Sequence, residues 1–186
     1  MRKFCLVLII LFLANASFAQ KLVSKYYSEC YDKFYGIYES GSTFLIDVHS
    51  EGNESDPVRI RILCTNYLKF INSMKATRDK FASWIDVAKE NGIDHIVKEM
   101  DIHFPAVWLT WISTRRWVNG DLELKPKFLV QEGKPFLFFS TNVLKGSRHQ
   151  EFTLIFSSVR EMDDFIYALL YREGAPDDVR QDELFK

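Results

Sequence analysis

The sequence has 186 residues, with 24 Lys and Arg against 25 Asp and Glu, and a formal net charge of −1. This balance lacks the basic excess that nucleic-acid binding requires, so we expect no nucleic-acid partner. Hydrophobic residues make up 47% of the chain, which is enough to bury the core of one domain of this length.

The N-terminal stretch has the order of a secretory signal. Arg2 and Lys3 precede an apolar run from Phe4 to Ala14, and mostly small residues follow up to Ala19. About 11 apolar residues are too few to cross a bilayer core, which takes roughly 20. We therefore predict cleavage between Ala19 and Gln20 and an exported protein, periplasmic or secreted, without a transmembrane anchor after cleavage. An uncleaved anchor is the alternative.

The remaining sequence predicts an α+β protein. We expect residues 1–19 to be the signal peptide, residues 20–174 to form a single α+β globular domain, and residues 175–186 to be an acidic flexible tail. The patterns indicate a twisted antiparallel sheet of about six to seven strands, with two amphipathic helices, one after Cys64 and one C-terminal.

The first part of the domain is typical of paired strands. The segment from Lys21 to Lys33 has aromatic residues at mixed spacing. This pattern is compatible with a short helix packed on the sheet or with a poorly ordered segment that leads into the domain. Tyr35 to Tyr38 and Thr43 to His49 flank a glycine-containing turn and predict a hairpin. Val58 to Cys64 alternates apolar residues with arginines, which indicates a strand with one solvated face.

Asn66 to Glu90 is the longest helix candidate, because its apolar residues follow a helical stripe. We expect Thr65 or Asn66 to cap its start, and Asn91-Gly92 to end it with a left-handed residue. Two helices broken near Thr77 are the alternative.

Three patterns follow the long helix. Asp94 to Glu99 suggests one more helical turn, and Phe104 to Ile112 is a short apolar run that predicts a strand buried on both faces. Asn119-Gly120 is a strong signal for a hairpin turn. Lys127 to Gln131 and Phe136 to Thr141 predict a further strand pair.

The clearest pattern lies at the C-terminal end. Phe152 to Phe156 predicts a strand, and the next residues open an amphipathic helix. Ser158 can cap the first turn, and Glu161 can reach back to the cap residue. Gly174 and Pro176 are typical of the end of a helix.

Two cysteines, Cys30 and Cys64, remain after the predicted cleavage. In an oxidising compartment this pair can form a disulfide that closes a loop of about 35 residues. Two separate buried thiols are the alternative, since sequence alone does not supply the geometry of a bridge.

Two Asp-x-His pairs are the candidate metal ligands: Asp47 with His49, and Asp101 with His103. On a strand this spacing places both side chains on one face, and two pairs on neighbouring strands could bind zinc through nitrogen and oxygen. Each histidine can equally form a structural pair with its neighbouring carboxylate.

Arg115, Arg116 and Trp117 form a small basic and aromatic patch, with Lys125 and Lys127 expected across the predicted hairpin. Such a surface can grip an anionic sugar or a polyphosphate. An ordinary solvated strand face is the alternative.

The sequence contains no glycine-rich phosphate loop, no Gly-x-Ser-x-Gly nucleophile elbow, no His-Glu-x-x-His zinc motif and no Cys-x-x-Cys motif. We therefore favour a non-catalytic binding or interaction domain of the cell envelope, with an unknown envelope or extracellular partner and no cofactor. A metal-dependent hydrolase that uses the Asp-x-His pairs is the alternative, and a structural or assembly subunit is a third class.

Two resemblances accompany this interpretation. The strand and helix from Phe152 to Leu170 resemble the closing strand and helix of pleckstrin-homology-like domains, whose last helix plugs a bent antiparallel barrel. Phe104-Pro-x-Val-x-Leu-x-Trp111, Leu124-Lys-Pro-Lys-Phe-Leu129 and the final Phe-x-Leu-Ile-Phe-x-Ser make the whole chain similar to small exported Bacteroidetes proteins of unknown function. The second resemblance implies a location and no activity.

Overall fold

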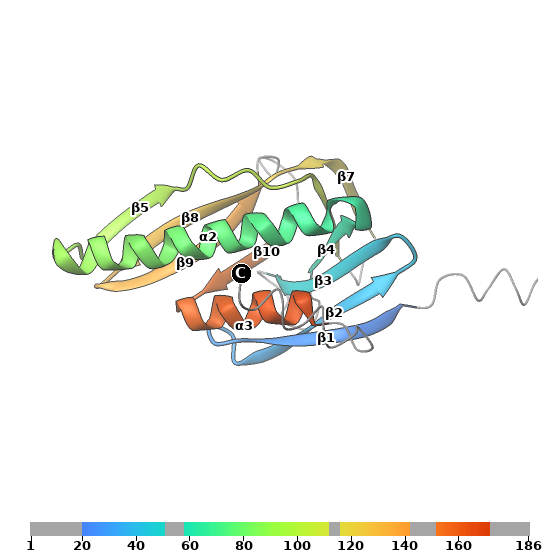
Figure 1. Cartoon of the computed structure of the whole chain (residues 1–186), viewed down its shortest axis with the longest axis horizontal. Helices are drawn as coiled ribbons and strands as arrows, with labels where there is room; N and C mark the ends of the chain where they lie inside the picture. The colour runs from blue at the N-terminus through green and yellow to red at the C-terminus, as the bar shows by residue number, and fades with distance from the viewer. Residues whose placement is uncertain (1–19, 51–57, 112–115, 142–151, 172–186) are drawn as a thin grey trace, which may run out of the picture.

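The computed structural model describes residues 20–50, 58–111, 116–141 and 152–171 (Figure 1). The predicted signal peptide and acidic tail lie outside these residues. The predicted fold class is confirmed: the described chain is α+β, with one antiparallel sheet and two helices. In these ranges the sheet contains ten strands, more than the six or seven that the sequence patterns indicated.

The first four strands form an antiparallel meander: β1 (Lys21–Ser28), β2 (Lys33–Ser40), β3 (Thr43–Ser50) and β4 (Val58–Leu63). The hairpin at the glycine-containing turn and the alternating strand β4 are confirmed. The prediction of a short helix or a poorly ordered segment over Lys21 to Lys33 was wrong, because these residues begin with strand β1. A register shift between Leu22 and Ser24 interrupts the alternation of β1, so its buried residues, Val23, Tyr26 and Ser28, lack the period of two that marks a strand.

Helix α2 (Cys64–Glu90) is one continuous helix, as the main prediction had it, without a break at Thr77. Its predicted cap was wrong: Leu63 occupies the N-cap position and makes no side-chain cap bond. The amide of Cys64 instead donates to the carbonyl of Ser42 at 2.9 Å. A carbonyl of the β2–β3 turn thus accepts a hydrogen bond from one of the free amides at the start of the helix. Gly92, with φ of 59°, supplies the predicted left-handed residue after the helix.

Strands β5 (His95–Glu99), β6 (Val107–Trp111) and β7 (Arg116–Leu122) follow α2. The expected helical turn over the first of these segments was wrong, because it pairs with a later strand as an edge of the sheet. The expected turn at Asn119-Gly120 was also wrong. These residues lie inside β7, where the pairing with β6 shifts register, so the glycine marks a bulge.

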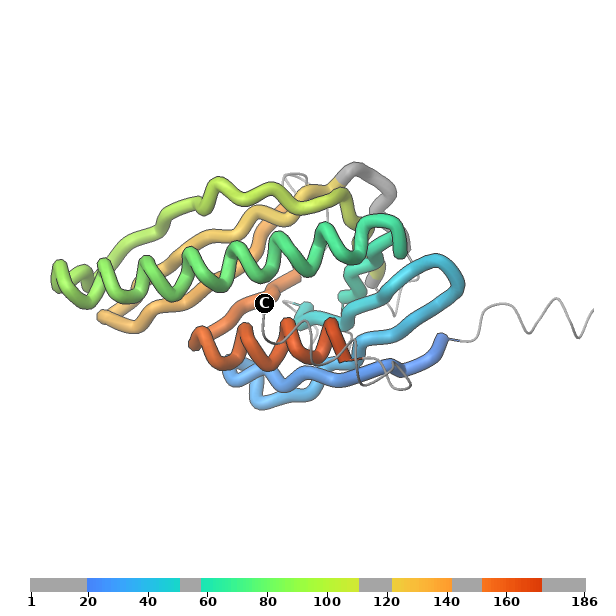
Figure 2. Tube along the Cα trace, viewed as in Figure 1, coloured from blue at the N-terminus to red at the C-terminus, as the bar shows by residue number. Residues whose placement is uncertain are grey.

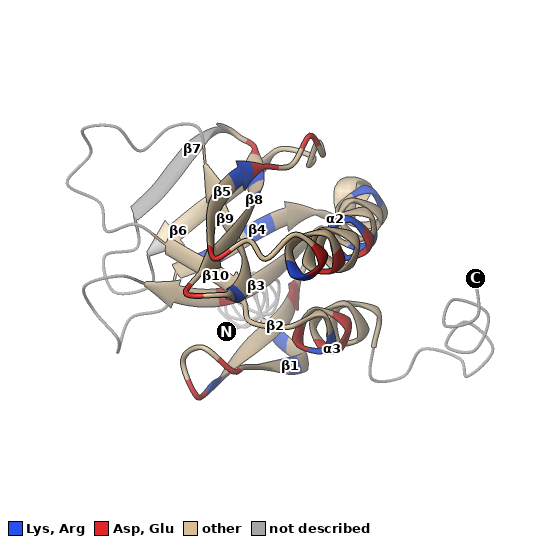
Figure 3. Ribbon diagram, turned by 90° about the vertical axis from the view of Figure 1, so that its left-hand side faces the viewer, with Lys and Arg blue, Asp and Glu red and all other residues tan. Residues whose placement is uncertain are grey.

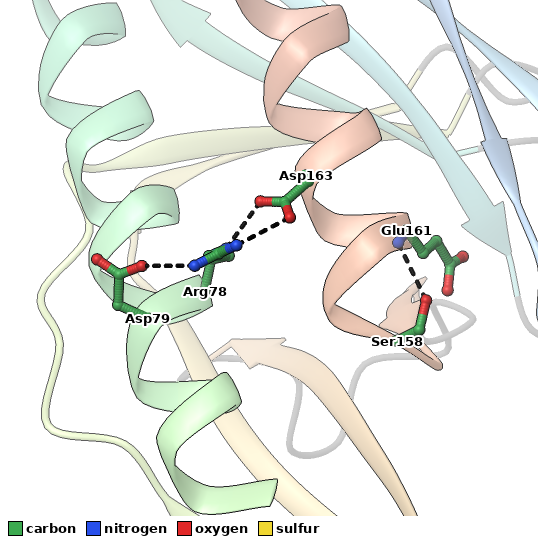
Figure 4. A network of polar contacts seen from close by, with 5 residues as sticks. All are labelled: Arg78, Asp79, Ser158, Glu161 and Asp163. Carbon is green, nitrogen blue, oxygen red and sulfur yellow. Dashed lines mark hydrogen bonds and ion pairs between the residues drawn. The ribbon is translucent and has the colours of Figure 1, made fainter. Parts of the chain in front are cut away.

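The last described elements are β8 (Leu124–Gln131), β9 (Lys134–Thr141), β10 (Phe152–Phe156) and α3 (Val159–Leu170), which confirms the last predicted strands and the C-terminal helix. The Ser158 hydroxyl accepts the amide of Glu161 at 3.0 Å, as predicted (Figure 4). The predicted return contact was displaced by one residue: Glu161 accepts the amide of Ser157 at 2.7 Å, not that of the cap residue.

Strand β3 is the branch point of the sheet. Its first half pairs with β2 and its last two residues pair with β10, while β4 occupies the opposite edge. The pairing of β2 with β3 ends at Ile46. The carbonyl of Asp47 therefore accepts a hydrogen bond from the Tyr26 hydroxyl, at 2.9 Å, and not from the backbone of β2. The strands β5, β8, β9 and β10 therefore continue the sheet on one side of β3, and β1 and β2 diverge from it (Figure 2).

Both helices pack on the same face of the sheet, so the protein has two layers (Figure 3). A chain of aromatic contacts joins them through the core, with ring centroids 4.7 to 6.1 Å apart, and its members are Phe70, Phe104, Phe139, Phe156, Phe165 and Tyr26. Of the helices in the described ranges, neither is long and apolar enough to span a bilayer.

The C-terminal turn of α3 is tied to distant parts of the chain. The Ser24 hydroxyl donates to the carbonyl of Ala168 at 2.5 Å, and the Tyr67 hydroxyl to that of Leu169 at 2.6 Å. Such bonds satisfy carbonyl groups that have no partner within the helix. On the exposed side, Arg78 of α2 forms a two-point ion pair with Asp163, at 2.7 and 3.0 Å (Figure 4).

Candidate functional site

The face of the sheet opposite the helices carries the candidate site. We call it the outer face and define it by residues of β1, β2, β3, β4 and β6 that alternate with core residues: Leu22, Lys25, Tyr27, Phe34, Tyr38, Leu45, Asp47, Arg59, Arg61, Trp108 and Thr110. No helix in the described ranges covers it (Figure 3). Cross-strand pairing places Leu45, Arg61 and Trp108 in one row.

Arg59 is fixed at the centre of the outer face. Its guanidinium makes two hydrogen bonds to Asp47, at 2.6 and 3.1 Å, and a third to the Gln20 side-chain oxygen at 2.8 Å. Its charged group also lies over the ring of Tyr38, 4.7 Å from the centroid. Because planar arginine can combine a two-point carboxylate contact with stacking, this arrangement holds the aromatic ring and the cation in one place.

Glycine at position 36 makes room for the Tyr38 ring. A Cβ atom there would lie 2.5 Å from the Tyr38 hydroxyl oxygen, so any other residue would displace the ring. Partial burial, followed by the charge of Asp47, raises the pKa of Tyr38, while Arg59 acts in the opposite direction. The ring is therefore neutral over the ordinary pH range and acts as an apolar platform.

A second arginine and ring lie beside the first. The guanidinium of Arg61 is 5.3 Å from the centroid of the Trp108 ring. Thr110, two residues along β6, is only 7% exposed, yet its hydroxyl has no hydrogen-bond partner in the described part of the chain. A buried hydroxyl without a partner is uncommon in folded proteins.

The β1–β2 hairpin extends the outer face with exposed apolar residues. Tyr27 and Phe34 face each other across the hairpin with ring centroids 5.1 Å apart, and they are 39% and 66% exposed. Leu22 on the same face is 39% exposed, and Lys25 lies between it and Tyr27. Exposed aromatic residues grouped on one face, rather than scattered, are typical of an interaction surface.

The structure does not bring the two Asp-x-His pairs together. Asp47 is engaged by Arg59, and His49 stacks on Tyr31 with centroids 3.7 Å apart while its Nδ1 atom lies 3.1 Å from the Tyr35 hydroxyl. The second pair lies outside the strands, between β5 and β6. In the described ranges, no group of three or more His, Cys, Asp or Glu side chains is placed to hold a metal ion.

His103 belongs to an exposed contact near the start of β8. Its Nδ1 atom lies 2.9 Å from a carboxylate oxygen of Glu123, and its Nε2 atom 3.9 Å from Asp101. The hydrogen bond to Glu123 raises the pKa of His103 above the ordinary 6.5, and the charges of Glu123 and then Asp101 act in the same direction.

We expect an NMR titration of His103 to give a pKa above 6.5, and the substitution Glu123→Gln to lower it. The change Asp101→Asn is the matched control and should lower it less. Because the folded-state pKa is raised, the contact stabilises the protein below the unfolded pKa, and this contribution is lost as pH rises through the folded value. An unchanged titration in the Glu123 variant would contradict this account.

The two cysteines are free thiols at opposite ends of β2. Cys30 lies in the turn before this strand, and the amide of Cys64 bonds to Ser42 just after it. Eight residues at about 3.3 Å each separate the ends by roughly 25 Å. Disulfide formation needs Cα atoms within about 7 Å, so the fold keeps this pair apart.

The Cys30 thiol lies beside two carboxylates. Partial burial of the sulfur raises its pKa to about 11, with further contributions from Glu161 and Glu29. Because the thiolate is the nucleophile, this environment makes Cys30 unreactive at neutral pH.

In a Cys64→Ser variant, alkylation of Cys30 by iodoacetamide near pH 8 should be roughly 100-fold slower than that of an ordinary thiol, because the thiolate fraction falls in that proportion. The Cys30→Ser variant reports on Cys64 and is the control. Replacing Glu161 with glutamine should increase the rate of Cys30. A rate equal to that of glutathione would show that neither burial nor the two carboxylates raise the pKa of this thiol.

Lys125 and Lys127 do not lie across a hairpin from the predicted basic patch. Arg115 lies outside the described residues, and Arg116 and Trp117 belong to β7, paired with Trp111 and Thr110. Because Asn119-Gly120 is a bulge and not a turn, β8 does not pair with β7. Its two lysines lie instead beside β9 and β5, opposite Ser140 and Phe138 in the register with β9.

A pocket lies at the C-terminal end of α2, away from the outer face. It holds about 130 Å³ and is lined mainly by apolar residues: Ile85, Ala88, Ile93, Val130 and Pro135. Small-molecule sites usually enclose roughly 300 to 1,000 Å³. The size of this pocket therefore gives it little weight as a ligand site.

Sequence reasoning found part of the outer face. The alternation of β4 indicated that Arg59 and Arg61 would share one face, and this is confirmed, but that face is less solvated than expected because the Arg59 side chain is only 13% exposed. It did not identify Thr110 or the pairing of Trp108 with Arg61, since both depend on which strands are neighbours. No protein-family model, curated protein or solved structure matches the chain.

Proposed function

We propose that this chain is an exported, non-catalytic binding module of the cell envelope and that the outer face is its binding surface. The observation that carries the proposal is the exposed Tyr27–Phe34 ring pair on the same face as two arginines stacked on aromatic rings. Aromatic rings and arginines are the residue types that contribute most to binding at protein interfaces.

The position of Gln20 supports export. β1 begins at Lys21, directly after it, and the Gln20 side chain already contacts Arg59. The first strand of the described chain thus begins two residues after the predicted last residue of the signal peptide. The periplasmic or secreted location, and the likeness to small exported Bacteroidetes proteins, remain predictions. N-terminal sequencing of the exported protein checks the predicted cleavage between Ala19 and Gln20.

Site-specific photo-crosslinking in exporting cells tests the binding surface. A benzophenone amino acid is placed at Trp108 on the outer face, or at Trp84 on α2 as a matched control. Trp84 also lies beside cations, since the Lys80 and Lys98 ammonium groups are 5.3 and 4.7 Å from its ring centroid. We expect adducts from position 108 and not from position 84. No adduct at 108, or equal adducts at both positions, would overturn the proposal.

A further inference from the structure

We infer that a second copy of this chain pairs with strand β5, antiparallel and centred on Val97, so that the two sheets join into one. This symmetric dimer does not depend on the proposed function of the outer face. It follows from the open edge of β5, from the direction of its backbone groups and from the order of its side chains.

Strand β5 ends one side of the sheet. It pairs with β8, and no strand of the described ranges lies on its other side (Figure 1). Four of its five residues are exposed, and Val97 at its centre is 64% exposed. An apolar side chain in the middle of an open edge favours pairing with a strand of another chain.

Another edge strand, β1, has the protection that β5 lacks. A register shift interrupts β1 between Leu22 and Ser24, and the Ser24 hydroxyl bonds to the Ala168 carbonyl of α3. The pairing of β5 with β8 contains no such shift. A lysine that projects from an edge commonly prevents strand pairing. The Lys98 ammonium instead lies 4.7 Å from the centroid of the Trp84 ring, on the helix side of the sheet, so it leaves the edge open.

The backbone groups of β5 alternate between β8 and the open edge. The amide of Met100 donates to the carbonyl of Pro126 at 2.9 Å, and in an antiparallel pair every second residue bonds to the same neighbour. The even-numbered residues of β5 therefore bond to β8. The N–H and C=O groups of His95, Val97 and Glu99 point away from it, where they can bond to the same residues of a second copy.

The side-chain order of β5 is self-complementary. With Val97 on a two-fold axis, each Val97 faces the other, and His95 lies opposite Glu99 of the second copy. These side chains share the face opposite the helices, because the Lys98 ammonium between them lies over α2. Glu99 is 62% exposed and contacts Lys127 at 3.1 Å. A carboxylate accepts hydrogen bonds at both oxygens, so the imidazole can join this contact.

A second copy is therefore the occupant that this edge fits. An unrelated peptide would need its own matching strand, whereas β5 read in the opposite direction already supplies an apolar centre and an imidazole opposite each carboxylate. The two-fold axis is perpendicular to the sheet, so both outer faces lie on the same side of the dimer. Because five residues span only about 17 Å, the interface is small and its dimer should depend on concentration.

Sedimentation velocity of residues 20–186, over a series of concentrations up to about 1 mM, tests the dimer. We expect the wild type to dimerise as the concentration rises. Val97→Lys places two ammonium groups together on the axis, so it should raise the dissociation constant at least about tenfold. The melting temperature at low concentration should not change, because the Val97 side chain is exposed.

The matched control is Leu68→Lys. Leu68 is also 64% exposed, so this substitution adds the same charge in place of an apolar side chain of equal exposure. It lies near the start of α2, about 24 Å along the helix from Trp84, which is beside β5. This variant should dimerise as the wild type does.

An exchange of charges tests the register. His95→Glu places a carboxylate opposite Glu99, and Glu99→Lys places an ammonium group opposite His95, so each variant alone should dimerise at least about tenfold more weakly. An equimolar mixture pairs the new carboxylate with the new ammonium group. Native mass spectrometry should then detect a heterodimer in excess over both homodimers, since the two variants differ in mass.

The opposite results would overturn the inference. A wild type that stays monomeric at every concentration does not form this dimer. A dimer that Val97→Lys leaves unchanged, or that Leu68→Lys weakens equally, uses another surface. A mixture without an excess of heterodimer would exclude the antiparallel register centred on Val97.

Discussion

Replacing Glu161 with alanine is expected to lower the free energy of unfolding by about 3 to 5 kcal/mol, because a buried carboxylate here holds two backbone amides. Glu161 is 2% exposed. One of its oxygens accepts the amide of Glu29 at 2.8 Å, and the other accepts the amide and the hydroxyl of Ser157 at 2.7 and 2.9 Å. The side chain thereby joins the β1–β2 turn to the start of α3.

Two further variants separate the carboxylate from the helix cap. Glu161→Gln keeps the shape of the side chain but replaces one accepting oxygen with a donor. It should therefore lower the free energy of unfolding by roughly half as much as Glu161→Ala does. Ser158→Ala removes only the cap bond and should cost about 1 kcal/mol. Urea denaturation measures all three variants. A Glu161→Ala variant no less stable than Ser158→Ala would show that the two amides find other partners.

The second large effect is expected at the ion pair on the outer face. The side chains of Asp47 and Arg59 are only 8% and 13% exposed, and their contact uses two hydrogen bonds. Removing one partner leaves the other charge largely buried and unpaired. Asp47→Ala should therefore destabilise the protein by about 3 kcal/mol.

A double-mutant cycle tests this explanation. Replacing Asp47 with leucine and Arg59 with methionine together removes both charges, so the double variant should be more stable than either single one. Thermal melts at matched protein concentration provide the measurement. Additive losses from the two single substitutions would mean that the contact adds no coupling energy.

The elements that sequence patterns located correctly are those whose signal is local. The apolar period of α2, the cap at Ser158 and the left-handed glycine after α2 depend on residues that are close in the chain. For the same reason, the α+β class and the hairpin before β3 were predictable.

The errors arise where pairing with distant strands decides the local structure. A five-residue segment after α2 is a strand because β8 lies beside it, and its exposed pattern contains no alternation. Asn119-Gly120 has the composition of a tight turn, but the register with β6 makes it a bulge. Intrinsic preferences of short segments are weaker than such tertiary constraints.

The candidate site shows the same division. Two arginines on one face of β4 are visible in the sequence, whereas the residues that complete the surface come from strands far apart in the chain. Trp108 reaches Arg61 only because β6 pairs with β4, and the hairpin aromatics join through β2 and β3. Strand order follows from the global packing of the sheet, which local periodicity does not encode.

The branch at β3 determines when the molecule can finish folding. β10 pairs with β3, and hydrogen bonds join Ser24 to Ala168 and Tyr67 to Leu169, across 144 and 102 positions. The core therefore closes only after almost the whole domain has been synthesised, and long-range closure of this kind is slow. The proposed export moves the protein across a membrane as an unfolded chain. Because the core forms late, the chain stays unfolded during this passage and completes its fold only after its last strand has crossed.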